Sequence, residues 1–210
     1  MSPKKYEEQD FETHIVEHLT DAARGDGQYV QRDSSDYDKD LCLIPEEVIT
    51  FVKATQPKEY EKLQRQYGEE TDRNLCLRLR KNIQRWGTLK VLREGIKDRG
   101  AKIRLVYFRP SSTLNPEHEQ LYQQNRLAVV RQLHYSTKHP GRSLDLGLFI
   151  NGIPIFTAEL KNSLTGQFVE QAKKQYRTRR KPPEPLFQFK RCLAHFAVGN
   201  EEVYYTTELK

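Results

Sequence analysis

The strongest constraint on the fold is a pair of apolar segments joined by an asparagine and a glycine. Residues 143–150 read Ser-Leu-Asp-Leu-Gly-Leu-Phe-Ile, and residues 153–161 read Ile-Pro-Ile-Phe-Thr-Ala-Glu-Leu-Lys. Between them stands Asn151-Gly152, a dipeptide that favours the type I′ turn of a tight antiparallel connection. The sequence therefore predicts a β-hairpin over residues 143–161.

Helical and strand patterns on both sides of this hairpin predict an α/β fold. Apolar residues three and four positions apart predict a first amphipathic helix over residues 10–23 and a helical insertion near residues 45–86. The remaining predicted elements are a short helix over 91–97, a strand over 101–108, a helix over 115–125, a strand over 126–135, a helix over 166–180, and two closing strands over 193–198 and 203–207. The length of 210 residues fits one compact domain.

Composition excludes several classes of protein. With 30% charged residues, the chain has no uninterrupted apolar run long enough to cross a bilayer, and its first residues lack the apolar core of a secretory signal. We therefore expect a cytoplasmic protein. Cys42, Cys76 and Cys192 are odd in number and form no C-x-x-C pair, which predicts buried reduced thiols rather than disulfides or a zinc site.

The positive charge of the chain is concentrated in one segment. The formal net charge is +6, yet residues 171–191 alone contain eight basic residues and one acidic residue, so the rest of the chain sums to −1. Such a segment is often only a solvated face. Its concentration beside the hairpin favours a surface that contacts phosphate groups.

The hairpin also contains a candidate catalytic group. Asp145 lies on its first strand, and Glu159 and Lys161 share one face of its second strand because side chains alternate along a strand. Two carboxylates suit a hard divalent cation such as Mg²⁺, which phosphodiester hydrolysis uses to activate water, and the lysine suits the water or the phosphate. The alternative is an exposed strand face with a salt bridge. Glu208 and Lys210 repeat the Glu-x-Lys spacing but have no upstream acid on a hairpin partner.

A wider set of motifs resembles a known family. The hairpin sequence from Leu144 to Asn162, together with Thr165-Gly-Gln167, Gln175-Tyr-Arg177 and the stretch from Arg191 to Val198, resembles the N-terminal nuclease domain of the restriction (R) subunit of type I restriction-modification enzymes. The resemblance implies a PD-(D/E)xK restriction-endonuclease-like fold, a mixed sheet flanked by helices. It also implies Mg²⁺-dependent cleavage of double-stranded DNA with Asp145, Glu159 and Lys161 as the catalytic residues.

The same resemblance implies a larger assembly. In that family the nuclease domain precedes an ATP-dependent translocase and works with methyltransferase (M) and specificity (S) subunits. The 210 residues contain no G-x-x-x-x-G-K-[ST] loop. We therefore expect residues 1–210 to be a single nuclease domain from the N-terminal part of a longer chain, with ATP needed only in the translocase.

Several site residues are implied by the resemblance with alternatives left open. A carboxylate of the first helix is expected to reach the metal, and Glu12 is favoured over Glu17 because it follows Phe11 at the edge of the apolar stripe. The family's Gln-x-x-x-Tyr motif is altered, because the position four before Tyr176 is Ala172. Either Gln171 or Gln175 takes the place of the motif glutamine, and Gln175 is favoured.

The basic helix after the hairpin is expected to bind the DNA backbone. Lys173, Arg177 and Arg180 follow at spacings of four and three residues, which predicts one common helix face. Gln175 and Tyr176 are expected to contribute to the same contact. Two alternatives remain open: a non-catalytic module that binds DNA or docks partner subunits, and a standalone nuclease of the same fold.

Overall fold

A computed structural model describes residues 3–25, 27–112, 115–162, 169–180 and 183–209, with side chains from residue 9 onward. Its centre is a six-stranded sheet in the order β1-β4-β5-β6-β7-β8. These strands are β1 (Tyr29–Arg32), β4 (Leu127–His134), β5 (Ser143–Ile150), β6 (Ile153–Leu160), β7 (Ala194–Val198) and β8 (Val203–Thr206). The β1–β4 and β6–β7 pairs are parallel and the other pairs are antiparallel. The predicted mixed sheet is confirmed.

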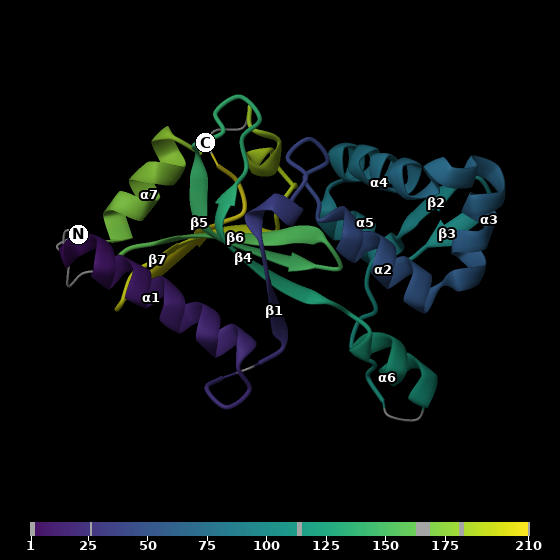
Figure 1. Cartoon of the computed structure of the whole chain (residues 1–210), viewed down its shortest axis with the longest axis horizontal. Helices are drawn as coiled ribbons and strands as arrows, with labels where there is room; N and C mark the ends of the chain where they lie inside the picture. The colour runs from purple at the N-terminus through teal and green to yellow at the C-terminus, as the bar shows by residue number, and fades with distance from the viewer. Residues whose placement is uncertain (1–2, 26, 113–114, 163–168, 181–182, 210) are drawn as a thin grey trace.

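Two helices cover opposite faces of this sheet near one end of the molecule (Figure 1). Helix α1 (Pro3–Thr20) packs Val16 against Leu146, Ala158 and Leu160. Helix α7 (Val169–Thr178) packs Val169 and Ala172 against Ala197 of β7. The neighbours of Ala197 on β7, Phe196 and Val198, face α1. Because side chains alternate along a strand, Ala197 and α7 lie on the opposite face of the sheet. The hairpin strands β5 and β6 are therefore covered on both faces, which explains their nearly continuous apolar sequence.

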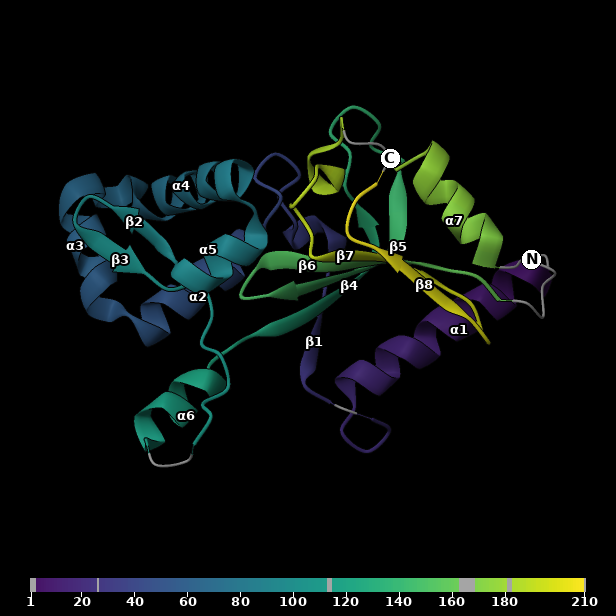
Figure 2. The same cartoon turned by 180° about the vertical axis from the view of Figure 1, so that it is seen from behind.

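The other end of the molecule is a helical lobe, seen from behind in Figure 2. It comprises α2 (Pro45–Thr55), α3 (Pro57–Tyr67), α4 (Thr71–Trp86), α5 (Thr88–Glu94) and the two-stranded sheet β2–β3 (Ile96–Asp98, Ala101–Ile103). Leu75, Leu79 and Ile83 of α4 share one core with Ile153 and Ile155 of β6. The predicted helical insertion is confirmed, and its core is continuous with the hairpin.

Short elements lie between or within these parts. They are the 3₁₀ helices η1 (Ser34–Asp36), η2 (Gly68–Glu70) and η4 (Pro185–Phe187), and helix α6 (Pro116–Gln123). The side chain of Asn115 caps α6 by accepting a hydrogen bond from the His118 backbone N–H. Across the described residues, no helix has the length and apolar character that crossing a membrane requires. Cys42, Cys76 and Cys192 are free and buried, as predicted.

The secondary structure differs from the sequence-based predictions in three places. Strand β1 was not predicted, because its pairing with β4 rather than an apolar pattern forms it; Val30 is half exposed. The strand predicted over 101–108 ends at Ile103, because the Gln56 side chain, not a neighbouring strand, pairs with both backbone groups of Arg104. The short helix predicted over 91–97 begins earlier and ends before Gly95, whose φ is +70°.

The helix predicted over 166–180 is described from Val169 and ends at Thr178. Its predicted start at Gly166, the Thr165–Gln167 motif and Lys181 lie outside the described residues.

The predicted Asn-Gly turn is confirmed in its backbone. Asn151 and Gly152 have φ of 49° and 77°, the positive values that a type I′ turn requires at both central positions. Asn151 is fully buried, and its side chain accepts a hydrogen bond from the Arg126 N–H and donates to the Leu105 carbonyl. These two hydrogen bonds connect the turn of the hairpin to the start of β4 and to the segment that follows β3 of the helical lobe.

Gly152→Ala is expected to destabilise the fold by about 3 kcal/mol or more, because two costs add. An added Cβ would require a side chain at positive φ and would lie 2.3 Å from the Ile44 carbonyl oxygen. Gly100→Ala is the matched control, since Gly100 also has positive φ but open space around it, and it should cost about 1 kcal/mol. Urea unfolding measures both, and equal losses would contradict the steric argument.

Candidate active site

The sheet separates at the end of the hairpin farthest from its turn. Regular pairing of β5 with β6 ends at Leu146 and Ala158, one residue before Asp145 on β5. The Asp145 carboxylate oxygen Oδ2 accepts a hydrogen bond of 2.6 Å from the Leu160 backbone N–H. Asp145 therefore bridges the separation and satisfies a backbone group that the lost pairing leaves without a strand partner.

This separation opens into a cavity of about 540 Å³, a size typical of ligand sites in proteins. All three residues predicted as catalytic line it. The lining includes Glu12, Arg131, Gln132, Asp145, Glu159, Lys161, Gln175 and Arg180. The sheet and its two flanking helices thus bring together charged residues from α1, β4, the β5–β6 hairpin and the segment after α7.

Glu159 is the most deeply buried charged group of the cavity, with 1% of its surface exposed. Its Oε1 accepts a hydrogen bond of 2.6 Å from Arg180 Nε. Burial and then the negative charge of Asp145 raise the pKa of Glu159 to about 7, while Arg180 and Lys161 oppose the increase. The negative charges of Glu159 and Asp145 therefore repel each other, and an additional cation near them would reduce this repulsion.

Lys161 completes the predicted group at the end of β6. Its backbone N–H donates to the Val198 carbonyl over 2.8 Å, so the residue continues the parallel pairing with β7. The side chain is buried, lines the cavity and exerts an electrostatic effect on Glu159. The alternation along β6 thus places Glu159 and Lys161 on the same side, as the sequence predicts.

Glu12 reaches the same cavity from α1. It is buried, and its two carboxylate oxygens accept hydrogen bonds from Arg131 Nε over 2.6 Å and Gln132 Nε2 over 2.8 Å. Glu17 forms a partly exposed ion pair with Arg24. The structure therefore places Glu12, not Glu17, at the cavity.

The three carboxylates do not form one ready-made metal cluster. Within the part of the chain that the structure describes, no three His, Cys, Asp or Glu side chains lie close enough together to hold a metal ion. Both oxygens of Glu12 have protein donors. The assignment of Glu12 as a metal ligand stays a prediction, and Asp145 and Glu159 are the better-placed pair.

Arg131 and Gln132 were missed by the sequence analysis. They hold Glu12 in place, and Gln132 has a φ of +44°, a rare backbone conformation for a residue other than glycine. The signal in the sequence is two consecutive polar residues inside an apolar strand, which breaks the alternation expected of β4. The irregularity lies opposite Asp145, where the sheet separates.

Of the two candidate glutamines, Gln175 and not Gln171 lines the cavity. Among the residues that the structure describes, the buried Oε1 atom of Gln175 has no hydrogen-bond partner. Tyr176, predicted to help bind DNA, lies inside the fold, where its hydroxyl and Thr157 Oγ1 are 2.9 Å apart and its ring packs near Phe187. Tyr176 is buried, and its contribution to DNA contact stays a prediction.

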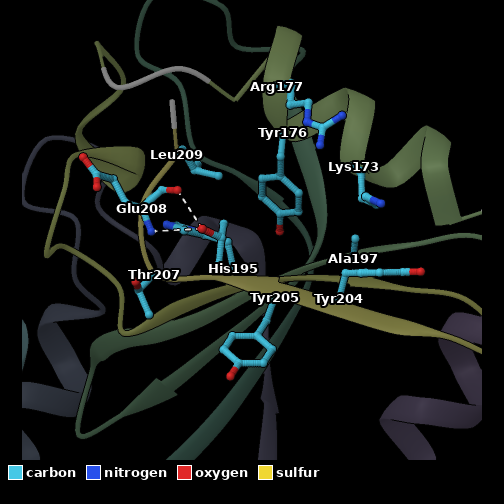
Figure 3. A pocket seen from close by; sticks show the side chains of 11 residues that line it. Lys173, Tyr176, Arg177, His195, Ala197, Tyr204, Tyr205, Thr207, Glu208 and Leu209 are labelled. Carbon is cyan, nitrogen blue, oxygen red and sulfur yellow. Dashed lines mark hydrogen bonds between the residues drawn. The ribbon is translucent and has the colours of Figure 1, made fainter.

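Lys173 and Arg177 lie beside a different pocket, between α7 and β8 (Figure 3). Its volume is about 550 Å³. Arg177 is exposed, and Lys173 Nζ lies 4.0 Å from the centroid of the Tyr204 ring. His195 also lines this pocket; burial lowers its pKa to about 4, and Nδ1 is 2.7 Å from Thr157 Oγ1. His195 is therefore a buried residue with a hydrogen-bonding partner.

The prediction that Arg180 shares an exposed face with Lys173 and Arg177 is wrong. Helix α7 ends at Thr178, and the chain then turns Arg180 inward, where it is buried against Glu159. The basic residues of this segment therefore divide into two groups. Lys173 and Arg177 face the pocket beside β8, whereas Arg180 belongs to the cavity that contains Asp145 and Glu159.

The fold and the site together define a mixed α/β domain whose central hairpin presents two carboxylates and a lysine to one cavity. Residues 49–210 match the family model described as type I restriction enzyme R protein N terminus, and the chain belongs to that family. The match begins within α2, so α1 and Glu12 lie outside it. Searches of curated proteins and of solved structures found no match.

Replacing Glu159 by glutamine in metal-free buffer is expected to remove a pH dependence of stability. The folded pKa near 7 exceeds the ordinary value of 4.5, so between these values the folded state holds a proton that the unfolded chain has released. The free energy of unfolding of the wild type should therefore fall by up to about 3 kcal/mol as the pH rises from 4.5 to 7.

Urea unfolding across this pH range measures the effect. Relative to the wild type, Glu159→Gln should gain stability as the pH rises, whatever its stability at pH 4.5. Glu208→Gln, a change at an exposed glutamate, is the matched control and should follow the wild type. Parallel curves for the wild type and Glu159→Gln would contradict the raised pKa.

Proposed function

We propose that this chain is the nuclease domain of a type I restriction enzyme R subunit and that it cleaves double-stranded DNA with Mg²⁺. The observation that carries the proposal is the convergence of Asp145, Glu159 and Lys161 on one cavity where the sheet separates. Membership of the R protein family supports it independently. We assign the fold to the PD-(D/E)xK class on the hairpin β5–β6, the mixed sheet and the helices on its two faces.

Mg²⁺ would be held by Asp145 and Glu159. Their carboxylate oxygens are the hard donors that this ion prefers, and they line the same water-accessible cavity. Burial and then the negative charge of Asp145 raise the pKa of Glu159, so a cation beside the two carboxylates would favour their ionised forms. When bound, the ion would activate water and stabilise the charge that develops on the phosphate.

The other residues of the cavity have separate tasks in this proposal. Lys161, a hydrogen-bond donor with a positive charge, orients the attacking water or the scissile phosphate. The buried acceptor oxygen of Gln175 has no partner within the described part of the chain, which makes Gln175 a candidate to position water or a deoxyribose group. Asp145 also maintains the opening by its hydrogen bond to the Leu160 N–H.

Cleavage in this proposal takes place in an assembly. The R protein family supports association with M and S subunits and with DNA, and an ATP-driven translocase would bring the duplex to the nuclease. Lys173 and Arg177 would contact the phosphate backbone from the opposite side of α7. Such contacts are independent of base sequence, so the domain itself needs no recognition of a specific site.

Lys161→Ala and Glu159→Gln are each expected to lower DNA cleavage by the assembled enzyme at least about 100-fold, because each removes a charge needed in the transition state. ATP hydrolysis should be unchanged. Glu208→Gln, within the other Glu-x-Lys pattern of the sequence, is the matched control and should cleave normally. Full cleavage by either cavity variant would refute the catalytic assignment and would favour the non-catalytic DNA-binding or docking module.

The double variant Lys173→Ala/Arg177→Ala is expected to bind unrelated duplexes equally weakly. The slope of log affinity against log salt concentration should decrease by up to about two units, one for each lost phosphate contact. Lys97→Ala/Lys102→Ala on the exposed side of β2–β3 removes the same charge from the helical lobe and should have no such effect. If the two double variants gave the same slope, the side of α7 that faces β8 would not be the DNA contact.

A further inference from the structure

Arg180 is built into the cavity by contacts with three strands or their ends. Its Nη2 donates to the Ser143 carbonyl over 2.7 Å at the start of β5, and its Nη1 donates to the Tyr135 hydroxyl over 2.8 Å just after β4. Nε and Nη2 both lie 2.6 Å from Glu159 Oε1 on β6. The guanidinium therefore spans the separation of the sheet from the side of α7.

These contacts fix the position of the guanidinium independently of Glu159. The Ser143 carbonyl, the Tyr135 hydroxyl and the Tyr135 ring, whose centroid is 5.3 Å from the guanidinium carbon, would all remain if Glu159 turned toward another cation. Because Arg180 is buried, its side chain could leave the cavity only if all these contacts broke. Its positive charge is a permanent part of the site.

The charge of the cavity centre follows from its members. When Asp145 and Glu159 are ionised, their two negative charges are balanced by Lys161 and Arg180, and all four side chains line the same space. A divalent cation that enters this neutral group adds two uncompensated positive charges close to a fixed guanidinium. The repulsion weakens binding of the metal alone, and a phosphodiester that enters with it reduces the excess.

We propose that Arg180 is a positioning residue that acts through Glu159 as a fixed counter-cation, so that the cavity holds a divalent cation firmly only together with a DNA phosphate. This inference rests on the proposed function, in which Asp145 and Glu159 hold the metal. By thermodynamic linkage, DNA and metal then raise each other's affinity by the same factor. Without a duplex, the nuclease site therefore binds the divalent cation only weakly.

Calorimetric titration of the chain with Mn²⁺ alone tests the proposal. Arg180→Gln should bind Mn²⁺ at least about tenfold more tightly than the wild type, because one nearby positive charge is removed. Arg180→Lys keeps the charge and should stay within about twofold of the wild type. Arg179→Gln is the matched control, since Arg179 is the exposed neighbour, and should leave the affinity unchanged. Unchanged or weaker binding by Arg180→Gln, or an equal gain in Arg179→Gln, would overturn the proposal.

A second measurement needs no variant and covers the case in which Arg180→Gln fails to fold. The wild type is titrated with Mn²⁺ in the presence of a short duplex with cleavage-resistant phosphorothioate linkages. The Mn²⁺ affinity should rise at least about tenfold relative to the free protein. Equal affinities with and without the duplex would overturn the role of Arg180.

Asp145→Ala separates this inference from the proposed function. If Asp145→Ala bound Mn²⁺ as the wild type does, the metal would not lie in the cavity and the proposed function itself would fail. If Asp145→Ala lost Mn²⁺ binding while Arg180→Gln left it unchanged, the metal site would stand and only the role of Arg180 would fall.

Discussion

The burial of the Glu159 carboxylate is the constraint on which the organisation of the site depends. An ionised carboxylate inside a sheet costs several kcal/mol unless cations and donors surround it. Here Arg180 provides the compensation, which requires the chain after α7 to turn inward and Tyr135 and Ser143 to receive the rest of the guanidinium. Replacing both Glu159 and Arg180 by well-packed apolar residues would keep the fold at least as stable. The ion pair is therefore better explained by the chemistry of the cavity than by the stability of the fold.

The hairpin and its three catalytic candidates could be predicted because short-range rules decide them. The Asn151-Gly152 pair has few backbone alternatives, and the period of two along a strand assigns Glu159 and Lys161 to one side whatever packs there. The helices α2 to α4 follow similarly from their apolar periodicity, because each buries one stripe of side chains in a common core. In these segments local preference and tertiary packing agree.

Long-range contacts decide the parts that the sequence could not reveal. The amide of Gln56 takes both backbone groups of Arg104 and so replaces a strand that apolar content alone predicts. Strand β1 exists through its pairing with β4. For Arg180, helical spacing predicts a face shared with Lys173 and Arg177, but the helix ends two residues earlier and a buried carboxylate attracts the side chain inward. A pattern of charges does not say which of them is buried.

Helix α7 connects the two regions that the proposed function requires. Successive residues of a helix are rotated by about 100°, so Gln175 and Arg177 point to opposite sides, and Tyr176 between them is held in the core by Thr157. Because the same Thr157 shares the face of β6 with Glu159, the anchor of the helix and the buried carboxylate lie on one strand. A duplex that touches Lys173 and Arg177 on one side of α7 and reaches Asp145 and Glu159 on the other must therefore pass over the exposed surface of the helix at Lys174. Because the contact between Tyr176 and Thr157 attaches α7 to β6, the position of the backbone contacts is linked to that of the cavity.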